Sequence, residues 1–97
     1  MNDEIIFIKL DLFRLNQTVY IPDKIGIKNT RYVALDDLPE FIGYLANDKK
    51  ISNVKIIGQK DFSLPIAEDI RTYCVKNYSN NYINIEIIEG EWLCQNI

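Results

Sequence analysis

The first part of the chain is rich in apolar and β-branched residues, and its side chains would alternate between two faces with the period of two that is typical of a β-strand. The longest such stretch covers residues 4–13, and shorter ones follow at 18–21, 31–35, 54–57 and 82–88. One side of the first strand would be aliphatic, carrying Ile6, Ile8, Leu10 and Leu12. The other side would be mixed, carrying Ile5, Phe7, Lys9, Asp11 and Phe13. The pattern therefore predicts five strands, of which the first has one face suited to a core.

Two further stretches repeat their apolar residues with the 3.6-residue period of an α-helix. In the first stretch, Asp37 is placed to act as N-cap, with Glu40 three residues later as its capping-box partner. In the second, Ser63 is placed to act as N-cap in the same way. The apolar stripes would consist of Leu38, Phe41, Ile42 and Leu45 in the first helix and of Phe62, Ile66, Ile70, Tyr73 and Cys74 in the second. We therefore expect two amphipathic helices, one before and one after the strand at 54–57 in the sequence.

The resulting element order, βββαβαβ, restricts the possible arrangements of the chain. Hairpins make the first three strands antiparallel, and each helix then returns the chain to a parallel strand by a right-handed crossover. If the sheet grows in one direction through both crossovers, both helices cover the same face. We expect an α/β (α+β) fold with a five-stranded mixed sheet and both helices on one face. It would form a single domain over residues 1–97, with its core at 4–89 and a C-terminal tail at 90–97.

Three carboxylates occupy positions that a metal-dependent enzyme would use. Asp11 lies on the first predicted strand, Asp61 follows the fourth, and Glu40 opens the first helix. With strand order 3-2-1-4-5, the chain resembles the ribonuclease H-like superfamily in topology over residues 4–89. The resemblance implies a nuclease whose carboxylates hold a pair of Mg²⁺ ions. The chain departs from that superfamily because no glycine follows Asp11 and because a capping box already explains Glu40.

Composition narrows the classes of function. The chain is 47% hydrophobic, which favours a globular protein over a disordered one. Its net charge of −3 disfavours nucleic acid as a partner. It has no histidine and two separated cysteines, so we expect no metal, no cofactor and no histidine-assisted nucleophile. Free thiols, the acidic N-terminus and the absence of a long apolar run predict a cytoplasmic protein without membrane contact. Richness in isoleucine and asparagine is typical of AT-rich genes, as in a low-GC bacterium or its phages.

The face opposite the helices is the strongest pointer to function. Aromatic and aliphatic side chains would mix there with a few charges, the usual composition of a protein interface. The predicted interface residues are Ile5, Phe7, Phe13, Tyr20, Tyr32, Ile57, Ile88 and Trp92, the last either covering part of the face or anchoring a partner. We expect a non-enzymatic interaction or assembly module, in which this face binds a partner protein or a second copy. The alternative is the Mg²⁺-dependent nuclease with Asp11, Asp61 and Glu40.

Overall fold

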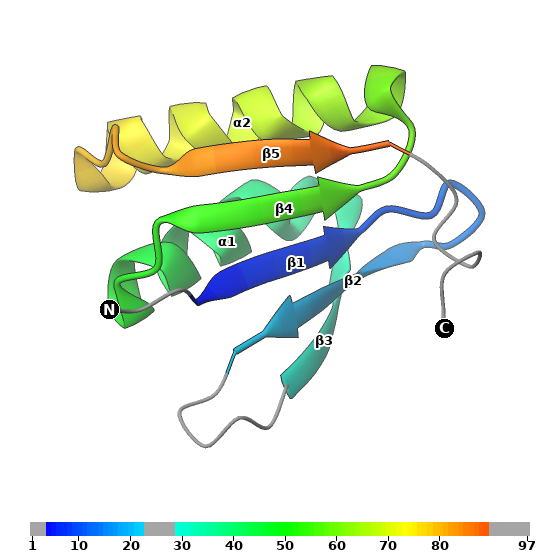
Figure 1. The fold of residues 1–97 in the computed structure, drawn as a ribbon, viewed down its shortest axis with the longest axis horizontal. Helices are drawn as coiled ribbons and strands as arrows, with labels where there is room; N and C mark the ends of the chain where they lie inside the picture. Colours follow the sequence, from blue (N-terminus) through cyan, green and yellow to red (C-terminus); the bar gives the residue numbers. More distant parts are fainter. Residues whose placement is uncertain (1–3, 23–28, 90–97) are drawn as a thin grey trace.

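A computed structural model of the chain describes residues 4–22 and 29–89. Five strands, two α-helices and one 3₁₀ turn follow one another as the alternation and the helical stripes predict (Figure 1). Their bounds are β1 (Ile5–Lys9), β2 (Asn16–Ile21), β3 (Asn29–Ala34), η1 (Leu35–Asp37), α1 (Leu38–Lys49), β4 (Asn53–Ile57), α2 (Lys60–Tyr78) and β5 (Asn84–Ile88). No helix within these residues is both long and apolar enough to cross a membrane.

The strands form one mixed sheet in the order β3-β2-β1-β4-β5, which confirms the predicted order (Figure 1). β1 pairs antiparallel with β2 and parallel with β4. β2 pairs antiparallel with β3, and β4 pairs parallel with β5. The first strand in sequence is therefore the central strand of the sheet, and β3 and β5 are its edges.

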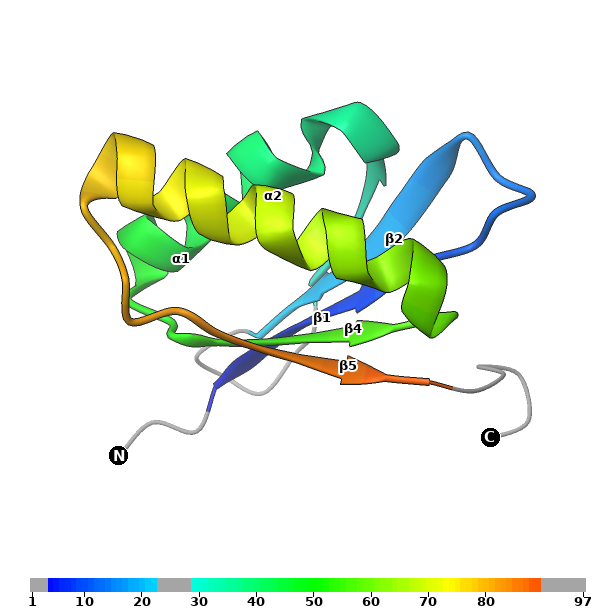
Figure 2. The same ribbon diagram turned by 90° about the horizontal axis from the view of Figure 1, so that it is seen from above.

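Both helices lie on the same face of the sheet, as Figure 2 shows. The side chains that alternate toward the helices, such as Ile6, Ile8, Val19 and Ile56, are fully buried. They pack with the apolar stripes of α1 and α2 into one hydrophobic cluster. The fold is thus two layers, with helices above and the sheet below, and its core lies between them.

The first strand is shorter than the alternation predicts. β1 ends at Lys9, although Leu10 remains buried and its N–H still donates to the Ile57 carbonyl. Beyond it the chain turns, and the Arg14 N–H donates to the Asp11 carbonyl at 3.1 Å. Leu12 was expected in the core and Phe13 on the opposite sheet face, but both lie in this turn and are exposed to solvent. The prediction was wrong here because apolar residues continue from β1 into the turn, so the sequence does not mark where the strand ends.

Of the two predicted helix caps, one was right in position and the other was wrong. Asp37 is the N-cap residue of α1, as predicted, but it has helical dihedral angles and its side chain makes no capping hydrogen bond. α2 begins at Lys60, so Ser63 lies inside the helix and not at its N-cap. The carbonyl of Gln59 accepts hydrogen bonds from the N–H groups of Phe62 and Ser63, which starts the helix earlier than expected.

Candidate protein-interaction site

The face of the sheet away from the helices, here called the helix-free face, combines aromatic, aliphatic and charged side chains. The pairing register places Phe7 between Tyr20 and Lys55, at the centre of the sheet. Within residues 4–22 and 29–89, neither a helix nor a second sheet lies over this face (Figure 2). Its residues are Ile5, Phe7, Lys9, Asn16, Thr18, Tyr20, Thr30, Tyr32, Ala34, Asn53, Lys55, Ile57, Asn84, Glu86 and Ile88.

The predicted interface residues on this face differ in how much of each reaches solvent. Tyr32 on the edge strand β3 is 66% exposed, and Ile88 on the opposite edge is also exposed. Ile5, Phe7 and Tyr20 are half-buried, and Ile57 is buried. Phe13 belongs to the β1–β2 turn, and Trp92 lies outside the described residues. The exposed apolar positions on the helix-free face are therefore at its two edges, with half-buried aromatic rings between them.

Charge on this face is concentrated on β4 and β5. The Lys55 Nζ lies 3.7 Å from the Glu86 Oε1, across the parallel pair of strands. Because Glu86 is exposed, this ion pair is solvated and contributes little to stability. The aromatic rings of Phe7, Tyr20 and Tyr32 lie on the three antiparallel strands. The aromatic rings of the face therefore lie on β1, β2 and β3, where Lys9 is also present, and the Lys55–Glu86 pair lies on β4 and β5 together with Ile57 and Ile88.

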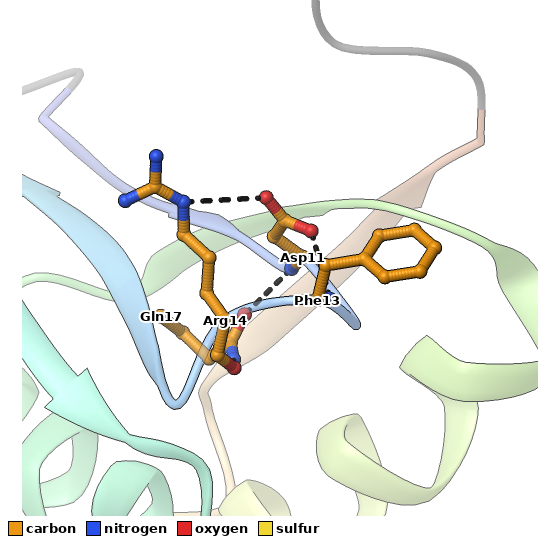
Figure 3. Close-up of polar contacts among 4 residues, drawn as sticks. All are labelled: Asp11, Phe13, Arg14 and Gln17. Atoms are coloured by element: carbon orange, nitrogen blue, oxygen red, sulfur yellow. Dashed lines mark hydrogen bonds and ion pairs between the residues drawn. The ribbon is translucent and has the colours of Figure 1, made fainter.

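A second surface feature is the β1–β2 loop, whose backbone is held by side chains of its own (Figure 3). The buried Gln17 accepts a hydrogen bond from the Asp11 N–H at 2.6 Å and donates one to the Arg14 carbonyl at 3.1 Å. The Asp11 carboxylate accepts the Phe13 N–H at 3.0 Å and lies 3.5 Å from the Arg14 Nε. These bonds satisfy the backbone of a turn that would otherwise depend on water.

The same loop exposes three large apolar side chains, here called the apolar tip. Leu12 is 52% exposed, Phe13 97% and Leu15 91%. Figure 3 shows the Phe13 ring pointing away from the three side chains that hold the turn. Sequence reasoning placed Phe13 on the sheet face and missed Leu15; the run of three apolar residues around Arg14 was the available signal. Such a concentration on one loop is unusual for a surface without a partner.

Beside this loop, a hollow of about 600 Å³ opens between β3 and α1. It was not predicted from the sequence, because its walls come from three separate segments of the chain. Two exposed carboxylates, Asp37 and Glu40, lie at the start of α1, and the aromatic rings come from Tyr32, Phe41 and Tyr44. The full set of lining residues is Asn16, Arg31, Tyr32, Val33, Ala34, Asp37, Glu40, Phe41 and Tyr44.

The three carboxylates of the nuclease alternative lie on three different elements. Asp11 is engaged within the β1–β2 loop, Glu40 lines the hollow, and Asp61 lies in the first turn of α2. Across the part of the chain that the structure describes, no group of three or more acidic, cysteine or histidine residues could hold a metal ion. Cys74 is buried in α2, and desolvation raises the pKa of its thiol, which disfavours the reactive thiolate.

No family model, no curated protein and no solved structure matches this chain. The resemblance to the ribonuclease H-like superfamily therefore stays a prediction from topology.

Proposed function

We propose that this chain is a non-enzymatic assembly module that binds a second copy of itself through the helix-free face. The observation that carries the proposal is that both helices cover one side of the sheet (Figure 2). The strands therefore present their second face, with Phe7 at its centre, without a covering layer from the described residues. A twofold-symmetric dimer needs only one self-complementary surface, so a second copy is the simplest partner.

The make-up of the face supports this proposal. Aromatic residues and exposed aliphatic side chains are what interface cores contain, and charged pairs such as Lys55 and Glu86 belong to interface rims. Burying one large apolar side chain contributes about 1.5–3 kcal/mol. Partial burial of Phe7, Tyr20, Tyr32 and Ile88 in both copies therefore offsets part of the entropic cost of association.

Substitution of Phe7 by lysine tests the proposal by placing a charge at the centre of the face. We expect the mass from light scattering to fall for Phe7→Lys, and also for Ile88→Lys at the β5 edge, which carries less risk of unfolding. The matched control is Thr72→Lys, since Thr72 is exposed on α2 on the other side of the molecule. Circular dichroism checks that each variant is folded. An unchanged mass for both face variants would overturn the proposal.

A further inference from the structure

We infer that copies of this chain also associate at a second surface, where the apolar tip of one copy enters the hollow of another. This contact shares lining residues such as Tyr32 with the helix-free face, but its tip lies in the β1–β2 loop and its other aromatic walls lie on α1. Its two halves are Phe13 with its neighbours Leu12 and Leu15, and the space bounded by β3 and α1. Three observations lead to it: the fixed shape of the tip, the chemistry of the hollow, and their adjacency in one chain.

The tip has the properties of a preformed binding element. Gln17 and Asp11 together hold the loop through hydrogen bonds to three backbone groups. Little conformational entropy remains to be lost when such a loop binds, which is what makes a preorganised element effective. Phe13 is almost completely exposed, so the tip does not fill the hollow of its own copy. It is a convex apolar element that fits a concave partner surface.

The hollow offers complementary chemistry. Its aromatic rings, Phe41 and Tyr44 on α1 and Tyr32 on β3, suit a phenylalanine side chain. Asp37 and Glu40 give it two carboxylates, and the largely exposed Arg14 guanidinium beside the tip has one carboxylate of its own copy, that of Asp11, at 3.5 Å. A tip entering the hollow brings Arg14 close to these acids. Arg31 also lines the hollow, so the complementarity rests on two carboxylates against one resident cation.

Adjacency decides in favour of a second copy as the occupant. Asn16, which lines the hollow, follows the tip residue Leu15 directly in the chain. Since tip and hollow are side by side, a single twofold rotation can place each tip in the other copy's hollow. An anionic membrane surface is disfavoured as the occupant by Asp11 in the loop and by Asp37 and Glu40 in the adjacent hollow. A reciprocal dimer satisfies both features at once.

The test uses the Phe7→Lys background, which removes association through the helix-free face. In that background we expect a dimer to form within a range of protein concentrations that extends up to about 1 mM. Phe13→Asp should raise its dissociation constant by at least about 100-fold, since both copies lose their Phe13 contact. Tyr44→Lys should do the same by removing an aromatic wall and placing a cation opposite Arg14. Thr72→Lys again serves as the matched control.

Mixing the two variants distinguishes a tip-to-hollow contact from any other association. Phe13→Asp keeps an intact hollow and Tyr44→Lys keeps an intact tip, so the mixture should form a heterodimer more readily than either variant alone forms a dimer. An unchanged mass for Phe13→Asp, or no heterodimer in the mixture, would overturn the inference. So would binding of the full chain to phosphatidylcholine vesicles that Phe13→Asp abolishes while the mass stays the same. Failure of the helix-free-face proposal shows instead as an effect of Phe13→Asp with none of Phe7→Lys.

Discussion

Replacing Ser63 by alanine should make this protein more stable, which is the opposite of what most substitutions in a core do. Ser63 is fully buried where α2 packs on the ends of β1 and β4. Its hydroxyl has no hydrogen-bond partner among the described residues. The neighbouring backbone is close, since a Cβ built on Gly58 would lie 3.3 Å from the Ser63 Oγ. A polar group is thus enclosed without compensation.

The size of the effect follows from three contributions. Burying an unsatisfied hydroxyl costs about 1–3 kcal/mol, and this cost disappears in the variant. Alanine is a better helix former than serine by up to about 0.5 kcal/mol. The lost dispersion contacts of one oxygen atom act in the other direction by a few tenths of a kcal/mol. We therefore expect Ser63→Ala to raise the free energy of unfolding by about 1–3 kcal/mol.

Urea denaturation followed by circular dichroism at the helix band measures this difference. A domain of this length is expected to unfold in a two-state manner, and an unchanged m-value would show that the midpoint shift reflects stability. Thermal unfolding should show an increase of about 4–8 °C for each kcal/mol. Thr72→Ala is the matched control, because Thr72 lies exposed on the same helix and reports helix propensity alone.

This reasoning would be refuted if Ser63→Ala raised the free energy of unfolding by no more than Thr72→Ala does. Such a result would mean that the hydroxyl is satisfied in solution, for example through a backbone carbonyl of α2. A clear loss of stability would mean in addition that the oxygen is needed to fill its site.

Two other substitutions test the packing and the loop, and the pH dependence of stability tests the buried thiol. Gly43→Ala should lower stability by roughly 1–3 kcal/mol despite better helix propensity, because the new Cβ would lie 2.7 Å from the Tyr73 Cδ1; urea denaturation measures this, and a gain would show that the ring moves aside freely. Gln17→Leu should lower it by about 1–3 kcal/mol and speed amide exchange in the β1–β2 loop, and unaltered exchange would contradict the bracing role. Burial raises the pKa of the Cys74 thiol above its ordinary value near 9, so the unfolded chain ionises first and stability falls as pH rises beyond that value. In a Cys94→Ala background, the fall in stability should be steeper when residue 74 is cysteine than when it is alanine. Equal slopes would refute this prediction.

Much of the fold could be predicted because side-chain alternation fixes which face each strand residue occupies. Ile6 and Ile8 are completely buried and Phe7 is not, as the period of two requires. Hairpin connectivity and the handedness of crossovers leave few arrangements, and among these the order 3-2-1-4-5 is the one that the ribonuclease H-like resemblance implies.

The errors came where the same local pattern suits two structures. Leu12 and Phe13 continue the apolar content of β1, but the chain turns at these residues, where the Asp11 N–H donates to the Gln17 side chain and the Phe13 N–H donates to the Asp11 carboxylate. Ser63 precedes Leu and Pro as Asp37 does, yet a serine can lie inside a helix as well as at its start. Only tertiary packing decides between these possibilities.

The candidate site was only partly accessible from the sequence. The helix-free face follows from alternation once both helices are placed on one side. The hollow does not, because residues from β2, β3 and α1 meet there through the sheet register. The apolar tip became visible only when the end of β1 was known.

The central position of β1 has a consequence for synthesis of the chain on the ribosome. Ile5 pairs with Asn53, so one edge of the middle strand waits for 48 further residues (53 − 5) before its neighbour is made. Until then the nascent meander of β1, β2 and β3 exposes an unpaired backbone edge and the apolar face that the helices later cover. Non-local parallel pairing of this kind is slow, and uncovered edges are where nascent chains aggregate. The late synthesis of β4 therefore prolongs the time for which this edge of β1 stays unpaired.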